Sequence, residues 1–143
     1  MLIYLAGPMT GIRHFNFEAF DDAAVILRAR GYDVTSPAEM DDADSRDAAL
    51  HSETGSAGTG SHEGKTWGDF LARDVKLLAD GGIEGIVCLP DWWLSSGAKL
   101  ETFVANLLNL PIYPYQAHPG MVPMSLLQLH AGWDGRNPFE AWA

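Results

Sequence analysis

The chain has 143 residues, a net charge of −10 and a pI near 4.6, and hydrophobic residues make up 47% of it. This length and composition predict a single domain over residues 1–143 with its own core, and the acidic balance argues against a protein that binds DNA, RNA or an anionic membrane. A small anion is not excluded, because a few backbone amides can bind a phosphate at any net charge.

The first residues lack the basic start of a signal peptide, and no apolar run approaches the length of a membrane span. The single cysteine, Cys88, lies inside an apolar run, which is typical of a buried core thiol and allows no disulfide within the chain. These features favour a protein of the reducing cytoplasm.

Short apolar runs alternate with helical periodicity along the chain. A strand over residues 2–6 is followed by a helix from Asn16, its N-cap, to about Arg30, then by Gly31 just after the C-cap and a strand over 32–36. Further on, the pattern predicts a helix over 67–79, a strand over 83–89, a helix over 97–108 and a strand over 112–115. This order predicts a doubly wound α/β fold of the flavodoxin or Rossmann kind, with a mainly parallel sheet of four to five strands and helices on both faces.

Two segments do not fit this alternation. Residues 41–66 are acidic and then rich in glycine and serine, so they predict a mobile surface insertion in which a short helix over 46–51 is one option. The tail, residues 116–143, contains a candidate helix over 123–130. Its Trp133, Phe139 and Trp142 are costly to leave in water, so we expect the tail to pack on the domain or on a second subunit.

The stretch from Ser95 to Glu101 follows the third apolar strand and opens a helix. This places Glu101 in the first helical turn, near the carboxyl end of a strand, where ligands of α/β sheets usually bind. The helix dipole and the unpaired amides of that turn favour the ionised form of Glu101. Such a carboxylate can attack an electrophilic carbon, whereas the simpler interpretation is a glutamate that only complements the helix dipole.

Two further polar side chains stand among apolar neighbours. Asp74 has apolar residues at positions 70, 71, 77 and 78 on the same helix face, where a carboxylate is costly unless it is bonded or used. It either serves a site or caps a neighbouring loop from inside the domain. Tyr4 lies in the first strand, and a structural hydrogen bond is the simplest use of its phenol.

The loop after the first strand consists of Gly7, Pro8, Met9, Thr10 and Gly11. A turn between a strand and a helix can hold phosphate or sugar oxygens on its amides, although this one lacks the full dinucleotide-binding pattern. Trp92 and Trp93 are either core or interface residues or an aromatic wall against a planar base. The five histidines show no metal-ligand spacing with one another or with Cys88, so we expect no metal and no cofactor.

Together these pieces resemble the nucleoside 2-deoxyribosyltransferase superfamily, in particular its nucleoside 5′-monophosphate N-glycosidase branch and phage-type members of unknown function. The resemblance covers about residues 2–40 and 67–115, and its motifs are Ile3 to Pro8, Arg73 and Asp74, and Ser95, Gly97 and Glu101. It implies that Glu101 attacks C1′ of the sugar and expels the base, that Asp74 handles the base or its proton, and that Tyr4 orients Glu101. The implied chemistry is that of a retaining glycosidase, with water or a second base as the final acceptor.

Within this resemblance, Ser95 favours a phosphorylated substrate. The transferases that act on free nucleosides have an aspartate here, which would repel a phosphate, whereas the monophosphate hydrolases have a serine that touches it. The other substrate-binding residues that we expect are Gly7 to Gly11, Trp92 and Gly97. Pro8 and Thr10 stand where the hydrolases tend to have Ser and Arg, so Arg13 is the candidate substitute.

The sequence thus predicts a hydrolase that cleaves the N-glycosidic bond of a (2′-deoxy)nucleoside 5′-monophosphate through a covalent glycosyl–Glu101 intermediate. The products are the free base and (deoxy)ribose 5-phosphate. One alternative is a deoxyribosyltransferase that exchanges bases, and another is a non-catalytic protein that binds or sequesters a nucleotide. The resemblance also implies a homodimer or higher homo-oligomer in the cytoplasm of a bacterium or a phage-infected host.

Overall fold

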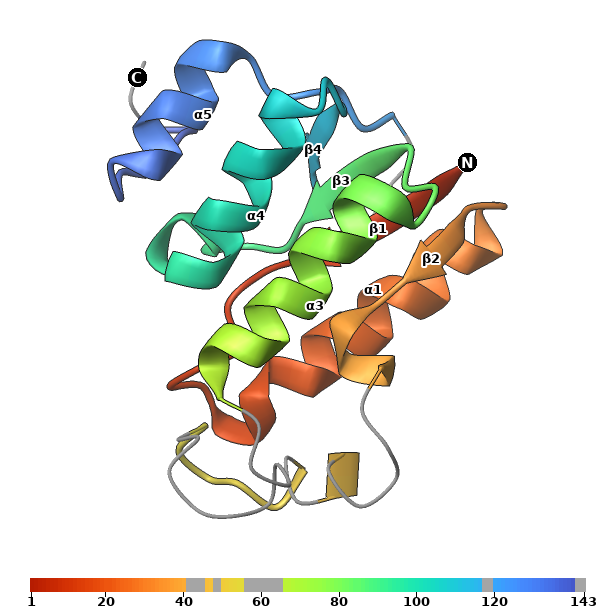
Figure 1. Ribbon diagram of the computed structural model, residues 1–143, viewed down its shortest axis with the longest axis vertical. Helices are drawn as coiled ribbons and strands as arrows, with labels where there is room; N and C mark the ends of the chain where they lie inside the picture. Colours follow the sequence, from red (N-terminus) through yellow and green to blue (C-terminus); the bar gives the residue numbers. More distant parts are fainter. Residues whose placement is uncertain (41–45, 48–49, 56–65, 117–119, 141–143) are drawn as a thin grey trace.

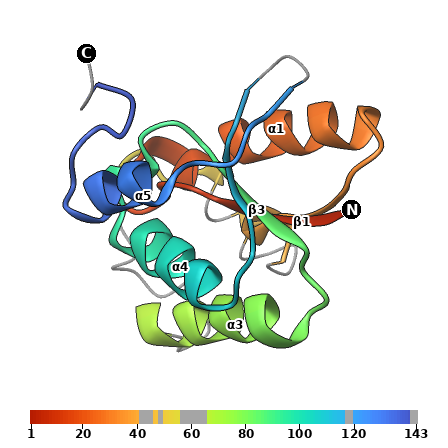
Figure 2. The same ribbon diagram turned by 90° about the horizontal axis from the view of Figure 1, so that it is seen from above.

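The computed structural model of the protein describes residues 1–40, 46–47, 50–55, 66–116 and 120–140. Its strands are β1 (Leu2–Ala6), β2 (Asp33–Thr35), β3 (Gly85–Cys88) and β4 (Ile112–Pro114), which form one all-parallel sheet in the order β2-β1-β3-β4. The helices that surround this sheet are α1 (Phe17–Ala29), α3 (Trp67–Asp80), α4 (Ser96–Leu107) and α5 (Leu126–Trp133) (Figure 1). Viewed from above, α1 covers one face of the sheet, and α3 and α4 cover the other (Figure 2). The predicted doubly wound α/β fold is confirmed, with four strands.

The predicted elements are found close to their expected positions. The first strand has the predicted bounds, and the other three are shorter than predicted by one to three residues. The amides of Glu84, Leu89 and Tyr115, just outside the observed strands, still donate to the neighbouring strands. Gly31 follows the C-cap of α1 with a φ of +93°, the left-handed conformation that glycine adopts at this position. Most of the predicted insertion at 41–66, with part of its optional helix at 46–51, lies outside the described residues.

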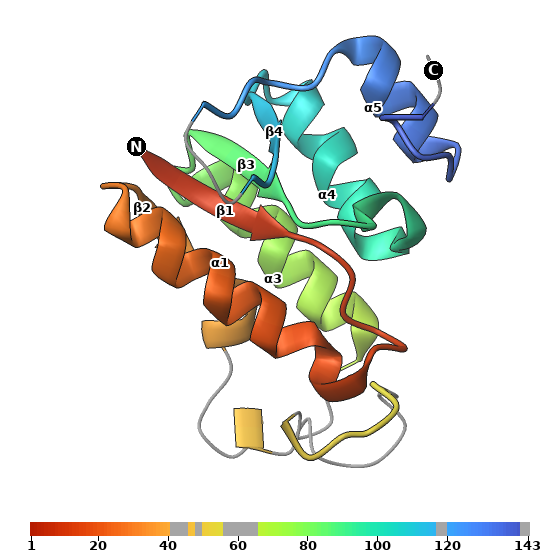
Figure 3. The same cartoon turned by 180° about the vertical axis from the view of Figure 1, so that it is seen from behind.

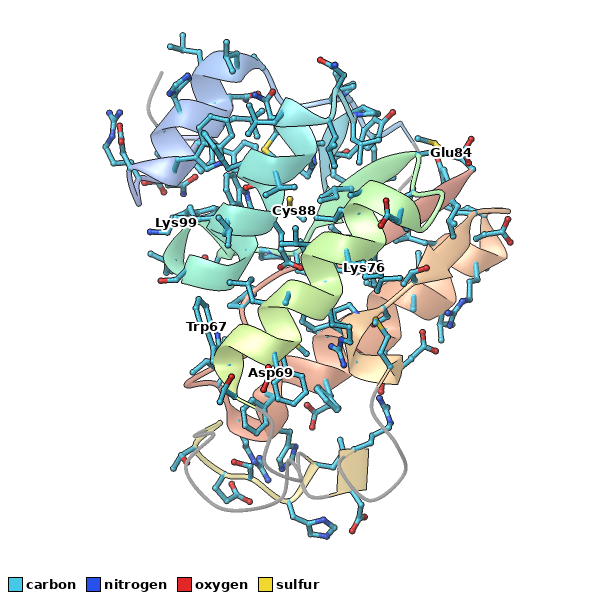
Figure 4. All side chains as sticks on the ribbon, viewed as in Figure 1. Trp67, Asp69, Lys76, Glu84, Cys88 and Lys99 are labelled. Atoms are coloured by element: carbon cyan, nitrogen blue, oxygen red, sulfur yellow. The ribbon has the colours of Figure 1, made fainter. Side chains whose placement is uncertain are left out.

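Side chains along β1 divide the core into two halves. Ile3 and Leu5 pack with α1, whereas Tyr4 and Ala6 pack with α3, α4 and α5, and all four are at most 1% exposed. Cys88, labelled on β3 in Figure 4, belongs to the half that contains Tyr4 and is buried, as predicted. Because successive strand residues point to opposite faces, this register directs the Tyr4 phenol to the face that α4 covers.

Figure 3 shows the connection from β1 to α1. This connection contains a segment with left-handed backbone conformation. His14, Phe15 and Asn16 have φ values of 55°, 51° and 61°, a conformation that costs a non-glycine residue about 1–2 kcal/mol. Asn16 is the N-cap residue, as predicted, but its side chain does not cap the helix. Its Nδ2 donates instead to the carbonyl oxygen of Pro8 at 3.0 Å, and the His14 amide donates to the Ser52 carbonyl at 2.7 Å. These bonds fix the loop after β1 between α1 and residues 50–55.

Part of the C-terminal tail packs on the domain. α5 begins three residues later than predicted, because Ser125 is its N-cap within a capping box. The Trp133 Nε1 atom donates to Thr102 Oγ1 of α4 at 3.0 Å, and the ring of Phe139 lies 6.1 Å from that of Trp93. Packing of the tail on its own domain is therefore confirmed for these residues, whereas Trp142 lies outside the described residues.

Gly132 lets α5 approach the domain. A Cβ atom at this position would lie 2.5 Å from Cζ2 of Trp92, and closer still to Cη2. We expect Gly132→Ala to lower the free energy of unfolding by about 2 kcal/mol, because the buried indole would have to move. Urea unfolding measures this change. The control is Gly68→Ala in α3, where a Cβ meets only Thr66 Oγ1 at 3.6 Å; a loss of similar size in the control would contradict the proposed clash.

Candidate active site

β1 and β3 are neighbours in the sheet, but the helices that follow them lie on opposite faces. α1 follows β1 on one face and α4 follows β3 on the other, so the carboxyl ends of these two strands form the topological switch point at which open α/β sheets bind ligands (Figure 2). A cavity of about 610 Å³ opens there, a size typical of small-molecule sites. Its lining comprises Gly7, Met9, Thr10, Phe15, Phe17, Pro37, Thr66, Trp67, Phe70, Leu71, Arg73, Asp74, Leu94, Ser95, Ser96, Gly97, Ala98 and Glu101.

Glu101 and Tyr4 meet at the wall of this cavity. The Tyr4 side chain comes from β1 and is fully buried, and Glu101 comes from α4 and is 6% exposed. The Tyr4 hydroxyl donates a hydrogen bond to Glu101 Oε2. Burial, followed by the neighbouring Glu101 charge, raises the pKa of Tyr4 well above its ordinary value, so the phenol stays a neutral donor. The structure thus gives Tyr4 the polar partner that its position in the strand requires.

The prediction that the start of its helix keeps Glu101 ionised is wrong. α4 begins at Ser96, so Glu101 lies in the second helical turn, beyond the unpaired amides of the first. Burial of the carboxyl, and then the charge of Asp74, raise its pKa to about 8, while the Tyr4 hydrogen bond and Arg73 act in the opposite direction. Near neutral pH the protonated form of Glu101 is therefore favoured in the free protein.

Asp74 lines the same cavity from α3. Its side chain is 14% exposed, as its place in the apolar stripe predicts, and its Oδ1 accepts a hydrogen bond from Arg73 Nε at 3.1 Å. The Arg73 guanidinium also lies over the ring of Phe70, 5.3 Å from the ring centroid. The structure therefore brings both predicted acids, Glu101 and Asp74, to one cavity from two different helices.

The start of α4 opens into the cavity. The Ser95 side chain is the N-cap and accepts a hydrogen bond from the Ala98 amide at 3.2 Å. Gly97 leaves open space, since a Cβ there would meet only Ser95 Oγ, at 3.9 Å. Free amides and hydroxyl groups at a helix N-terminus attract anions, so this part of the lining can bind a negatively charged group. Ser95 and Gly97, which were both predicted to bind substrate, line the cavity at this helix end.

The loop after β1 contributes only some of its predicted residues. Gly7, Met9 and Thr10 line the cavity, whereas Pro8 and Gly11 do not. The Pro8 carbonyl is used by Asn16, and the Gly11 amide donates to the Gly55 carbonyl at 2.9 Å. These backbone groups hold the loop in place instead of facing the cavity.

Two predicted binding residues lie elsewhere. Arg13 pairs with Glu53, with Nε 2.8 Å from Oε2, and both side chains are about two-thirds exposed outside the cavity lining. Trp92 is 1% exposed and packs against Gly132, so it is a core residue and not an aromatic wall against a base. The structure therefore does not bring Arg13 or Trp92 to the cavity in which they were predicted to bind substrate.

Aromatic side chains that the sequence motifs did not indicate as site residues form much of the apolar lining. Trp67 and Phe70 lie on α3, three residues apart, and Asp74 follows one turn later on the same face. Helical spacing alone indicated core residues, but Trp67 is 54% exposed and lies on the first turn of α3 (Figure 4). Asp74, at the end of this apolar face, was the signal in the sequence that the face borders a cavity. Phe15 reaches the cavity from the left-handed segment, which has no sequence signature.

A family model for a domain of unknown function, DUF4406, matches residues 1–114. The chain belongs to this family. The DUF4406 match covers every strand and α1, α3 and α4, with all of the cavity lining, and leaves out α5. Neither the curated proteins nor the solved structures that were searched contain a match. The description of the DUF4406 domain names no activity, so the resemblance to deoxyribosyltransferases stays a prediction.

The described ranges contain neither a metal-binding cluster nor a membrane-spanning helix. The His, Cys, Asp and Glu side chains of those ranges form no group of three or more that could hold a metal ion. None of their helices combines the length and the hydropathy needed to cross a membrane.

Proposed function

We propose that the protein is a hydrolase that cleaves the N-glycosidic bond of a 2′-deoxynucleoside 5′-monophosphate. The observation that carries the proposal is the Tyr4–Glu101 hydrogen bond at the wall of a cavity that Asp74 also lines. Retaining glycosidases place two carboxyl groups beside the anomeric carbon, one as nucleophile and one as acid. α4 and α3 supply one such group each.

The proposed reaction has two displacements. In the first, a Glu101 oxygen forms a bond to C1′ while the bond from C1′ to the base nitrogen breaks, and its electron pair leaves with the base. The proton of the Glu101 carboxyl first passes to Asp74, which gives it to the departing nitrogen, and Tyr4 holds the Glu101 side chain in place. In the second, water attacks C1′, which releases the sugar phosphate and restores the Glu101 carboxyl.

The 5′-phosphate is assigned to the N-terminus of α4. Ser95, Ser96 and Gly97 line the cavity at this helix end, where amides and hydroxyl groups can donate to a phosphate. The aromatic rings of Trp67 and Phe70, on the α3 side, offer apolar faces suited to a planar base. With the phosphate and the base at these two ends, the sugar of the proposed substrate would lie between them, toward Glu101.

The direct test incubates the full chain with a panel of nucleoside and deoxynucleoside monophosphates, followed by chromatography. The expected result is release of free base together with the sugar 5-phosphate from at least one member. Product formation only when a second free base is present would identify a transferase instead. Tight binding of a nucleotide that stays intact for hours would identify a non-catalytic binding protein, and either result would overturn the hydrolase.

Ser95→Asp is expected to weaken the binding of phosphorylated substrates more than that of unphosphorylated ones. Aspartate caps helices as well as serine does, so α4 should stay folded, but its charge would repel the phosphate. We expect KM for the monophosphate to rise about tenfold or more, with a smaller change for the unphosphorylated nucleoside. Ser125→Asp at the N-cap of α5, outside the cavity lining, is the matched control. An equal change of KM for both substrates would place the phosphate elsewhere.

A further inference from the structure

Arg73 is the cationic side chain of the cavity. Among the described lining residues it alone carries a positive charge, and the two carboxyl groups of Asp74 and Glu101 line the same cavity. Arg13, the cation that the sequence suggested, is paired with Glu53 outside it. The charge balance of the described lining therefore depends on Arg73.

The Arg73 guanidinium is held on two sides. Its Nε donates to Asp74 Oδ1 at 3.1 Å, and its Cζ lies 5.3 Å from the ring centroid of Phe70, one helical turn earlier. The Arg73 and Asp74 side chains are 28% and 14% exposed, so solvent screens this ion pair less than one on the open surface. A planar cation that is bonded along one edge and stacked on a ring has few orientations left. Asp74 thus has a well-fixed cationic partner.

Four polar side chains lie near the Glu101 carboxyl on the elements packed against α4. They are Tyr4 of β1, which donates a hydrogen bond, the neutral buried thiol of Cys88 on β3, and the opposite charges of Asp74 and Arg73 on α3. Burial and Asp74 raise the pKa of Glu101, whereas Tyr4 and Arg73 lower it. Of these four, only Arg73 is a cation.

We propose that Arg73 is a positioning residue that keeps Asp74 in its carboxylate form, so that the Asp74–Glu101 pair holds a single proton near neutral pH. The catalytic meaning of this role rests on the proposed function. When the shared proton passes to Asp74, Glu101 becomes the nucleophile and Asp74 becomes the acid for the departing base. Hydrolysis of the glycosyl ester by water yields a protonated Glu101 again, so a full turnover leaves the proton count of the pair unchanged.

The test measures the ionisation of Asp74 in the free protein, without any turnover. Carbon NMR of the full chain with ¹³C-labelled aspartate follows the Asp74 carboxyl against pH, with Asp74→Asn for assignment. In Arg73→Gln the midpoint is expected to rise by about one pH unit, because a cation that favours the charged form is lost. Arg73→Lys, which keeps the charge, should lie nearer the wild type. Lys76→Gln removes the same charge from a 78% exposed position of α3 and should leave the midpoint unchanged (Figure 4).

A Glu101→Gln background shows whether Arg73 acts on Asp74 directly. With Glu101 unable to titrate, the further change Arg73→Gln should still raise the Asp74 midpoint. Equal Asp74 midpoints for Arg73→Gln and Lys76→Gln, or loss of the Arg73 effect when Glu101 cannot titrate, would overturn the proposal. If the midpoints move as expected but no nucleotide is cleaved, the proposed function fails and the role of Arg73 stands. If cleavage occurs, the acid limb of the pH profile of kcat/KM should also move to higher pH in Arg73→Gln.

Discussion

Replacing Glu101 by glutamine is expected to lower the rate of base release about a thousandfold or more, because the variant loses the group that attacks C1′. The amide has nearly the shape of the carboxyl, and its oxygen can still accept the hydrogen bond of the Tyr4 hydroxyl. The cavity wall is therefore kept while the nucleophile is lost. Single-turnover and steady-state assays of released base measure the effect, and binding of the intact nucleotide to the variant shows that the cavity is preserved.

The matched control is Glu140→Gln, which makes the same chemical change at an exposed position outside the cavity. Its rate of base release should equal that of the wild type. If Glu101→Gln keeps more than about a tenth of the wild-type kcat, Glu101 is not the nucleophile, since loss of an attacking group is far more damaging than this. Such a result would leave the cavity as a binding site and move the chemistry to other residues.

Local sequence patterns predict much of this fold because they act within single elements. The apolar run at residues 2–6 and the helical periodicity from Trp67 onward fix a strand and a helix with nearly the observed bounds. Helical spacing also places Asp74 among apolar neighbours, and the structure keeps it there, 14% exposed. The strand order adds what no single element contains: it brings the ends of β1 and β3 together and so joins Tyr4 to Glu101, 97 residues away.

The errors concern contacts between distant segments. Arg13 is exposed and bonded to Glu53, 40 residues later, and Trp92 is buried by Gly132 of α5. The local sequence pattern around Arg13 or Trp92 does not reveal Glu53 or Gly132. It therefore allowed a role in the cavity for both Arg13 and Trp92. The ionisation of Glu101 failed for a similar reason, because the burial that raises its pKa comes from elements packed on α4 and not from the helix start.

The free energy of unfolding should depend on pH through Glu101. The native pKa of this carboxyl is raised from 4.5 to about 8, so between these values the native state binds more protons than the unfolded state. The difference in bound protons, unfolded minus native, is then negative, and the free energy of unfolding falls as pH rises. The stabilising effect of the bound proton is fully present below about pH 4.5 and is lost as pH rises through about 8.

Glu101→Gln does not titrate and should remove this part of the pH dependence. At about 1.4 kcal/mol for each pKa unit, the variant gains roughly 4 kcal/mol relative to the wild type between pH 4.5 and 9. Urea unfolding at several pH values measures both curves, and Glu140→Gln should run parallel to the wild type. Parallel curves for the wild type and Glu101→Gln would mean that the native carboxyl is not a buried acid. The expected gain instead means that the fold is less stable at alkaline pH because it keeps an ionisable group at the cavity wall, a compromise that favours a site over stability.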